Sequence, residues 1–278
     1  MGILRYELSE VQWRRVEPLL PGRCGTVGRP AEDNRRFVNG VLWVIRSGMR
    51  WADLPERYGK YKSVHKRLRA LGSGWCLGPH LLRLGTRQAE PVSDAGLDHR
   101  QSAPAGGHGP QKGGDKALGR SRGGLTTKVH LLVNGDGEPL EFRLSAGQRS
   151  DYTEAIALLG RRKAQAVIAD RGYDSSAIVA HDRSMGATVV IPSNVNRRQQ
   201  RTHDQNLYKL RNRIERCFNQ LKQFRRFATR YCKYALSFAA TVNIACSWLH
   251  LSNMSIQPST WRRTWHSSPT KRNSSRGW

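Results

Sequence analysis

Cysteine is scarce in this chain of 278 residues, and its five cysteines follow no regular spacing. They form no C-x-x-C pair, and none has a histidine partner at the spacing of a zinc finger. Structural zinc sites and disulfide frameworks both depend on regular spacing. The sequence therefore predicts neither kind of cross-link, and reduced thiols are typical of a cytoplasmic protein.

Long apolar runs are also missing. Residues 1–7 contain no apolar core of the kind that a signal peptide needs, and the longest apolar segment, 236–251, is interrupted by Asn243. A helix that crosses a membrane needs about 20 consecutive, mostly apolar residues. The sequence therefore predicts no membrane role.

Acidic residues are few, with 21 Asp and Glu against 47 Lys and Arg, and the net charge is +26. So large a field disfavours a compact chain through self-repulsion unless a polyanion neutralises it. Basic runs such as Arg35-Arg36, Lys66-Arg67 and Arg225-Arg226 occur throughout, which suits a long groove better than a single tail. Nucleic acid is the expected partner, although a ribosomal or packaging protein would have the same charge.

Residues 1–71 have the pattern of small helices. Ser9 caps a first segment, residues 32–46 carry a broad apolar face, and residues 59–71 form a basic candidate for a third helix. Helix-turn-helix units combine a packed scaffold with one basic helix. A small all-helical DNA-binding region is one interpretation, and a helical cap with a solvated basic face is the other.

Residues 72–110 differ from the rest, because glycine, proline, histidine and arginine there follow neither helical nor strand periodicity. An irregular segment of this length is unusual inside a compact domain. At the other end, residues 253–278 form a polar basic tail without periodicity. We expect that tail to be disordered or loosely attached.

Regular patterns return in residues 111–252. The turn Asn134–Gly137 lies between two apolar segments and is a strong hairpin signal, and Asp174 is the expected cap of a later helix. The expected elements are strands at 125–133, 139–144, 166–169 and 188–191, and helices at 151–159, after 174 and at 206–226. This order predicts an α/β domain with a mixed, α+β type of sheet.

The expected helix at 206–226 has three different faces. At 3.6 residues per turn, Tyr208, Arg211, Glu215 and Lys222 lie on one stripe beside an apolar arc. A third, solvent-facing side carries Lys209, Arg213 and Arg216. The stripe places one acid among several donors. An ordinary basic surface helix, with Arg211 and Glu215 as an i,i+4 ion pair, is the alternative interpretation.

Asp170 follows the short apolar strand 166–169. Ligands of open α/β sheets collect at the carboxyl ends of strands. An acid there and Glu215 on a facing helix could share divalent metal, which phosphoryl transfer uses to activate the attacking oxygen and to neutralise the leaving oxygen. Magnesium suits carboxylate and phosphate oxygens. A turn-forming or capping Asp is the alternative at this position.

Three segments of the chain resemble one enzyme family. They are Ala166-Val-Ile-Ala-Asp-Arg-Gly-Tyr-Asp174, Gly119-Arg-Ser-Arg-Gly-Gly-Leu-Thr-Thr-Lys128 and the spacing of Tyr208, Arg211, Glu215 and Lys222. They are similar to bacterial insertion-sequence transposases of the DDE type, in the fifth IS family. The resemblance implies an RNase H-like fold in which two Asp and one Glu use Mg²⁺ (or Mn²⁺) to cut DNA at element ends and join the freed 3′-hydroxyl to target DNA.

The resemblance also implies roles for single residues. Asp170 would be the second catalytic and metal-binding acid and Glu215 the third, with Tyr208 in a supporting position. Arg211 and Lys222 would bind DNA. The implied partners are double-stranded DNA, as terminal repeats and as target, and further copies of the chain assembled on that DNA, in the bacterial cytoplasm at the nucleoid.

The first acid of the family lies on an opening strand, in a segment resembling Ile-Asp-Ser. This chain has Leu97-Asp-His-Arg-Gln101 at that place, and its sequence has no strand character. Asp98 is the best substitute as catalytic and metal-binding acid, and Asp94 is second. If residues 98–101 are encoded GAT-CAT-CGA-CAG, reading one nucleotide later gives Ile-Ile-Asp-Ser. We therefore hypothesise that about residues 72–110 are translated out of frame, which would make the chain a damaged transposase.

Basic residues supply further candidates for DNA contacts. The segment Gly119–Gly124 could wrap a phosphate with its N–H groups and two guanidinium groups, or form a simple basic turn. The candidate DNA-binding residues are Arg120, Arg122, Lys128, Lys209, Arg211, Arg213, Arg216 and Lys222. The nine histidines, among them His203, show no ligand spacing and are interpreted as surface or core residues. A non-catalytic nucleic-acid-binding protein derived from a transposase is the alternative function, and a nuclease of the same fold would lack only strand joining.

Overall fold

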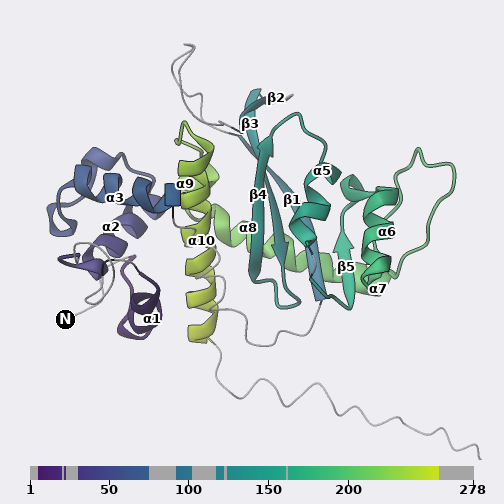
Figure 1. Ribbon diagram of the computed structural model, residues 1–278, viewed down its shortest axis with the longest axis horizontal. Coiled ribbons are helices and arrows are strands. Elements are labelled where there is room, and N and C mark those ends of the chain that lie inside the picture. The colour runs from purple at the N-terminus through teal and green to yellow at the C-terminus, as the bar shows by residue number, and fades with distance from the viewer. Residues whose placement is uncertain are drawn as a thin grey trace, which may run out of the picture.

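A sheet of six strands forms the centre of the structure, and helices cover both of its faces (Figure 1). In this computed structural model the chain is described for residues 6–20, 22, 31–74, 92–101, 117–121, 124–160 and 162–256. For residues 70–74, 92–101, 121 and 253–256 the description covers the backbone alone. Arg122 and most of the predicted tail at 253–278 lie outside the described residues.

The strands pair in the order β2-β3-β1-β5-β6, and β4 also pairs with β3. Their bounds are β1 (Val92–Gln101), β2 (Gly119–Ser121), β3 (Gly124–Val133), β4 (Pro139–Ala146), β5 (Ala166–Ala169) and β6 (Thr188–Val190). β1 is antiparallel to β3 and parallel to β5, and β5 is parallel to β6. β3 and β4 form the predicted hairpin, in which the Asn134 side chain accepts the N–H of Glu138 at 2.9 Å. The sheet is therefore mixed, as the sequence predicts.

Two layers of helices enclose the sheet. The helices are α1 (Glu10–Val16), α2 (Asn34–Ser47), α3 (Tyr61–Gly74), α5 (Tyr152–Leu159), α6 (Ser176–Ser184), α7 (Gln205–Tyr208), α8 (Asn212–Lys222), α9 (Arg225–Ala228) and α10 (Ala235–Ile256), with 3-10 turns η1 (Glu17–Leu19), η2 (Trp51–Asp53), η3 (Glu56–Tyr58), η4 (Arg171–Tyr173) and η5 (Lys209–Arg211). Neighbouring residues of a strand point to opposite faces. Leu132 accordingly packs in the core under α5 and α6, and Leu131 packs in the core under α8 and α10.

The helices α1 to α3 do not have a core of their own. Val41 of α2 and Leu68 of α3 belong to the same buried cluster as Trp248 of α10. The guanidinium group of Arg46 lies 4.9 Å from the ring of Phe224 and 4.8 Å from the ring of Trp248. Figure 1 shows α10 standing between these N-terminal helices and the sheet. The N-terminal region is therefore held against the rest of the protein by apolar packing and cation–π contacts.

Helix α10 is an element that the sequence analysis did not predict. Its residues Phe238, Val242 and Ala245 are fully buried in the shared core. By length and composition its segment Ala235–Ser252 could cross a membrane, but 56% of that segment is buried inside the protein. The helix is apolar because it packs against the N-terminal helices on one side and the sheet on the other.

The strand β1 contradicts the expectation that residues 97–101 have no strand character. Asp98 is paired with Val129 of β3, and Asp94 is paired with Ile168 of β5. Ladder hydrogen bonds join main-chain groups and do not depend on side-chain type, so two neighbouring strands can order a segment whose own sequence favours no strand. Within the expected irregular segment 72–110, the structure also continues α3 to Gly74, and residues 75–91 and 102–110 lie outside the described residues.

The predicted helix at 206–226 is not continuous. It consists of α7, the 3-10 turn η5, α8 and α9. Asp204 begins α7 by accepting the N–H groups of Asn206 at 2.7 Å and Leu207 at 3.0 Å. The expected apolar arc of this helix, which includes Ile214 and Phe218, does lie in the core. The amphipathic pattern was therefore correct for α8, although the helix that carries it is shorter.

Candidate active site

Asp170 lies where β5 ends and η4 begins. All four residues of β5 are buried, so the chain reaches this point from the interior of the sheet. The Asp170 Oδ1 atom accepts a hydrogen bond from the N–H of Gly172 at 2.9 Å. Asp170 therefore caps a turn, as the alternative interpretation expects, and it also stands at the carboxyl end of a strand, where α/β sheets place their ligands.

An open cleft of about 470 Å³ borders Asp170. Three segments of the chain meet there: the turn after β5, the loop after β6, and the start of the helical segment that carries Glu215. The lining residues are Asp170, Arg171, Gly172, Pro192, His203, Tyr208 and Arg211. Two residues of the predicted stripe, Tyr208 and Arg211, thus share a cavity with the predicted second acid.

Glu215 lies on α8 and is connected to the cleft through Arg211. The Arg211 Nη1 atom is 2.7 Å from the Glu215 carboxylate, and the Glu215 side chain is 52% exposed. The i,i+4 ion pair considered in the sequence analysis therefore exists. The Arg211 Nε atom is buried, and among the described residues it has no hydrogen-bond partner. A buried donor without an acceptor is unfavourable.

A second carboxylate, that of Asp151, lies beside Asp170. A methyl group added at Gly172 would meet Asp151 Oδ2 and Asp170 Oδ1, each at 3.1 Å, so the two oxygens flank this glycine. Asp151 is paired with Lys128, whose Nζ atom is 2.6 Å from Asp151 Oδ1. Only 10% of the Lys128 side chain is exposed. Lys128, one of the candidate DNA-binding residues, is therefore largely buried, and its ammonium group is engaged by Asp151.

A buried polar network lies behind the same turn. The Tyr173 hydroxyl is 3.4 Å from Nδ1 of His130, and Nε2 of His130 is 2.7 Å from the Ser145 hydroxyl. Burial, followed by the negative charges of Asp170 and Asp151, raises the pKa of Tyr173 well above its ordinary value. Tyr173 therefore stays neutral and holds the turn after β5 against β3 and β4.

The register of β1 locates the candidate first acid. The last paired position of β1 and β5 joins Ala95 to Ala169. Gly96 follows Ala95 as Asp170 follows Ala169, so Gly96 is level with Asp170 and Asp98 lies two residues farther along β1. The topology thus places Asp98 on the strand beside Asp170, but not at the level of Asp170.

The remaining acids do not complete a metal site within the part of the chain whose side chains are described. There, no group of three His, Cys, Asp or Glu side chains could hold a metal ion. The side chain of Asp98 is not among those described, because β1 is described by its backbone alone. Asp94, the second candidate for the first acid, is paired with Ile168 of β5, so it lies two residues before the level of Asp170.

The donors that are present nevertheless suit a divalent cation. Asp170 offers hard carboxylate oxygens in an open cleft, and Glu215 offers two more at the other end of its ion pair with Arg211. Mg²⁺ and Mn²⁺ prefer such oxygens. Because Arg211 neutralises Glu215 in this structure, a cation bound by Glu215 would have to compete with Arg211 or share the carboxylate with it.

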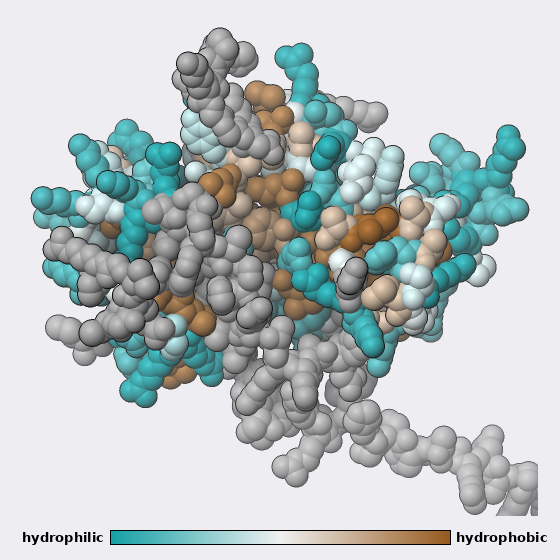
Figure 2. All heavy atoms as spheres, in the orientation of Figure 1, coloured by the Kyte–Doolittle hydropathy of each residue, from teal (hydrophilic) through white to brown (hydrophobic). Residues whose placement is uncertain are grey.

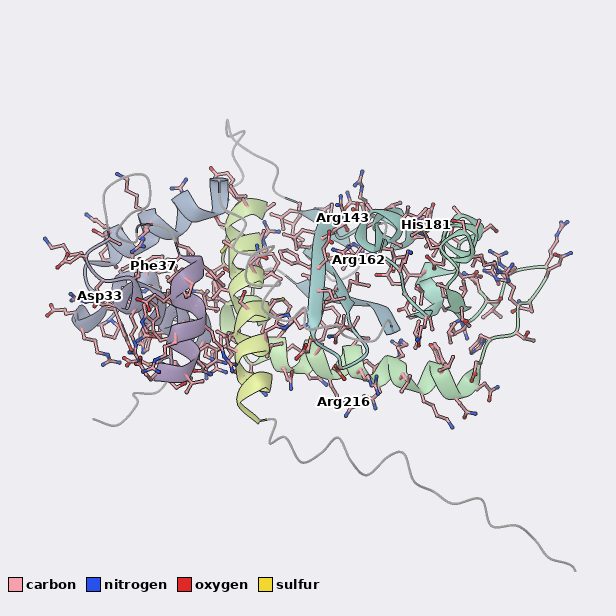
Figure 3. The ribbon with its side chains drawn as sticks, turned by 60° about the horizontal axis from the view of Figure 1, so that its bottom comes forward. Asp33, Phe37, Arg143, Arg162, His181 and Arg216 are labelled. Carbon is pink, nitrogen blue, oxygen red and sulfur yellow. The ribbon has the colours of Figure 1, made fainter. Side chains whose placement is uncertain are left out.

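The basic residues predicted on the outer side of α8 have different surroundings. Lys209 and Arg216 are exposed, and Figure 3 shows Arg216 on the side of α8 away from the sheet. Arg213 is half-buried and donates to the backbone carbonyl of Gly135 in the β3–β4 turn. Lys209 and Arg216 therefore face solvent, whereas Arg213 fastens α8 to the hairpin.

Two further candidates for DNA contacts lie elsewhere on the surface. Lys222 is exposed in the last turn of α8, and Arg120 is exposed on β2, where it is paired with Leu125. Their positions agree with the predicted DNA-binding roles without testing them.

Four residues that line the cleft were not predicted from the sequence: Arg171, Gly172, Pro192 and His203. His203 was interpreted as a surface or core residue, but it lines the cleft, and its ring packs edge-on against Tyr208 with 5.2 Å between ring centroids. No spacing in the sequence indicates this, because His203 and Pro192 belong to an irregular loop whose path is set by tertiary contacts.

Two family profiles match different parts of the chain. The family profile described as "Transposase DDE domain" matches residues 99–249, which is just over half of the chain. The profile described as "Putative transposase of IS4/5 family" matches residues 8–73. Neither match includes residues 74–98. No solved structure matches the chain significantly.

Relatives from three bacteria are similar to parts of the chain. One, named "Putative transposase for insertion sequence element IS6501" from Brucella ovis, is 38% identical over 129 residues, which cover 46% of this chain and 99% of the relative. The uncharacterized protein y4sN of Sinorhizobium fredii is 47% identical over 62 residues, covering 22% of this chain and 48% of the relative. A 16.2 kDa protein of insertion element IS402 from Burkholderia cepacia is 38% identical over 56 residues, covering 19% and 38%.

These matches agree with the geometry. The DDE domain profile covers β3 to β6, the cleft and Glu215. Domains of this type have an RNase H-like fold, which is consistent with the mixed sheet and its two helical layers. The chain belongs to the DDE transposases of insertion sequences.

Proposed function

We propose that this transposase cuts DNA at the ends of its insertion sequence, and joins the freed ends to target DNA, in the cleft beside Asp170. Asp170 and Glu215 act as the second and third acids, and Asp98 takes the place of the first. The observation that carries the proposal is that Asp170 shares one cavity with Tyr208 and Arg211, and that Arg211 forms an ion pair with Glu215.

DDE transposase domains generally use divalent metal ions. The carboxylates of Asp170, Glu215 and Asp98 would hold Mg²⁺ or Mn²⁺, which supplies positive charge to activate the attacking oxygen and to neutralise the leaving oxygen. In cleavage, a water oxygen bonds to phosphorus, the bond from phosphorus to the 3′-oxygen breaks, and that oxygen takes up a proton. In joining, the freed 3′-oxygen attacks a phosphorus of the target strand in the same way.

The residues of the chain position the DNA strand for this reaction. Arg211 lines the cleft, and its guanidinium group is suited to donate to a phosphate oxygen there. Lys209, Arg216 and Lys222 extend the positive surface along α8. Electrostatic contacts of this kind give affinity without reading base sequence.

The basic helix α3 supplies a second DNA-binding surface in this proposal. Its apolar residues Val64 and Leu68 are buried, while Lys62, Lys66 and Arg69 are exposed on the opposite side. A helix that is anchored by one face and basic on the other is suited to the DNA backbone or the major groove. In this proposal α3 binds the terminal repeats, the cleft takes the ends that are cut and the target DNA, and several copies assemble on the DNA at the nucleoid.

The proposed domains keep the boundaries of the sequence analysis. Residues 1–71 bind DNA, 72–110 form a segment of altered frame, 111–252 form the catalytic domain and 253–278 form a tail. The family matches at 8–73 and 99–249 support the first and third of these. Because α1 to α3 pack on α10, the two functional regions move as one body on DNA rather than as separate modules.

The test is nicking of a duplex that carries an element end, in Mg²⁺ or Mn²⁺. The wild-type chain should nick it, whereas Asp170→Asn and Glu215→Gln should bind the duplex with unchanged affinity and not nick it. Lys209→Ala and Arg216→Ala are the matched binding variants, and they should weaken binding across sequences and flatten its salt dependence. Normal nicking by Asp170→Asn would show that the acids are assigned wrongly.

A second candidate function is a non-catalytic DNA-binding protein derived from a transposase. Two observations favour it: no family match includes residues 74–98, and Gly96 rather than Asp98 is level with Asp170. Strongly salt-dependent binding by the wild-type chain, without nicking in either metal, would select this function. Sequencing the gene tests why catalysis would have been lost. The out-of-frame hypothesis requires that another reading frame encode Ile-Asp-Ser near codon 98.

A further inference from the structure

The carboxylate of Asp174 is buried, and it is bound by residues of the loop that follows β6. Its side chain is 1% exposed. It accepts the backbone N–H of Asn194 at 2.7 Å and the Nε–H of Arg197 at 3.0 Å, and its other oxygen accepts from Arg201. The predicted role of Asp174 as a helix cap is wrong, because Ser175 holds the N-cap position of α6.

The loop that Asp174 holds, residues 192–204, is also closed from within. The side-chain amide of Gln200 donates to the backbone carbonyls of Asn194 at 3.0 Å and Arg197 at 2.9 Å. The N–H of Arg201 donates to the buried hydroxyl of Ser193 at 2.8 Å. We call this segment the Asp174 loop. Its shape is set before any partner arrives, so binding would cost little ordering entropy.

Both ends of the Asp174 loop line the cleft. Pro192 stands at its start and His203 near its end, and the contact of His203 with Tyr208 joins the loop to α7. A strand that lies in the cleft against Asp170 must therefore pass beside this loop.

The outer part of the loop combines an apolar side chain with a positive one. Val195 is 70% exposed, and Arg198 and Gln199, which follow it in the same loop, are also exposed. In Figure 2 the hydrophilic end of the molecule projects on the right, over the region of α6 and this loop. Since Asp174 engages Arg197 and Arg201, Arg198 is the arginine of the loop that faces outward. A guanidinium group beside an apolar side chain suits DNA, where phosphates alternate with the apolar faces of sugars.

From this geometry we infer that the Asp174 loop is a preformed DNA-contacting element that grips the duplex next to the position of cleavage. Arg198 contacts a phosphate, and Val195 packs against the neighbouring sugar. Asp174 is a positioning residue, because it acts on the DNA only through the loop. The inference rests on the proposed function, since it takes the cleft beside Asp170 as the place where DNA is cut.

The test measures binding and not catalysis, so it does not depend on whether the chain is active. The full chain is bound to an end-bearing duplex in Ca²⁺, and affinity and protection of single phosphates are recorded. Arg198→Ala and Val195→Asp, both at exposed positions, should lower affinity about three- to tenfold and should lose protection only within a few nucleotides of the cleavage position. Arg183→Ala, which removes an exposed arginine at the opposite end of α6 from the Asp174 loop, is the charge-matched control and should keep that protection.

Asp174→Asn should give the same local loss together with faster hydrogen exchange in residues 194–201, because the loop is released. If both exposed variants keep the wild-type protection near the cut, the inference is overturned even though the chain still binds and nicks. If the variants lose protection there while Asp170→Asn nicks normally, the loop contact stands and the proposed active site fails.

Discussion

The strands β5 and β1 lie side by side and parallel at the centre of the sheet, yet they have very different sequences. β5 reads Ala-Val-Ile-Ala and is buried in all four residues, as expected for a strand covered on both faces. β1 reads Val-Ser-Asp-Ala-Gly-Leu-Asp-His-Arg-Gln and would not be chosen from its sequence as a central strand. The comparison shows that neighbouring strands can determine where a strand lies in a sheet. The chemistry at that position depends on which residue the strand carries there.

The same contrast separates the two acids. Asp170 is positioned by its own apolar strand and by the hydrogen bond that it accepts from Gly172. Asp98 is described through its backbone, which the ladder of β1 with β3 places opposite Val129. The second acid is therefore specified locally, and the first depends on register. A one-residue slip of β1 would move Asp98 to the other face of the sheet.

The largest predicted effect tests whether both strands contribute an acid. Asp170→Asn and Asp98→Asn should each reduce metal-dependent nicking about a thousandfold or more, because loss of either carboxylate removes a ligand from the metal site. Initial nicking rates on an end-bearing duplex measure this. If Asp98→Asn nicks like the wild type while Asp170→Asn does not, β1 supplies no catalytic acid.

The next prediction concerns stability and uses two residues that are register partners. Val167 of β5 is buried and is paired with Ser93 of β1. Val167→Ser should lower the free energy of unfolding by about 2–4 kcal/mol, because it leaves a cavity and buries a hydroxyl. Ser93→Val should raise it by up to about 1 kcal/mol, because a β-branched apolar residue suits a central strand. Urea unfolding measures both, and equal losses would contradict the comparison.

A smaller effect is expected at the turn after β5. Gly172→Ala places a methyl group 3.1 Å from Asp170 Oδ1 and Asp151 Oδ2, so the carboxylates must shift. Nicking should fall about tenfold, and the metal concentration for half-maximal rate should rise. Gly186→Ala is the control: it lies in open space with a φ of +80°, so it should cost stability but leave the metal dependence unchanged. The same metal dependence in both variants would contradict the proposed geometry.

The smallest predicted effect is a dependence of stability on alkaline pH. Burial and the charges of Asp170 and Asp151 raise the pKa of Tyr173 well above its ordinary value of 10.0. The unfolded chain then loses this proton first, so the free energy of unfolding should fall as pH rises above 10. Tyr173→Phe should flatten that fall, and Asp170→Asn should reduce it by lowering the pKa of Tyr173. Thermal unfolding between pH 9 and 11 measures the slopes, and an unchanged slope in Tyr173→Phe would exclude the effect.

Much of the fold could be predicted because its signals are local. The hairpin depends on the turn at Asn134–Gly137, β5 on a short apolar run, and α8 on the spacing of Ile214 and Phe218. The same patterns identified Asp170 and the Arg211–Glu215 pair. β1 and α10 were missed because β1 has no apolar alternation, and α10 has two buried sides and therefore no amphipathic stripe.

The site was predicted less completely than the fold. Lys128 was expected on the DNA surface and Asp174 at a helix cap, but each is the partner of a buried ion pair that joins residues far apart in the sequence. Residue type alone does not separate a lysine that meets phosphate from one that meets Asp151. Burial decides that, and burial is a property of the packed structure.

By itself, the amino-acid sequence determined the excess of positive charge, the alternation of strands and helices, and the acids at 170 and 215, because each depends on residue type or on short-range spacing. The tertiary structure alone decided that Asp98 lies on a central strand, that the N-terminal helices share one core with α10, and that the Asp174 loop stands at the mouth of the cleft. These features depend on contacts between segments that are far apart in the sequence. Such contacts form together only in the folded structure, so no local pattern of residues reveals them.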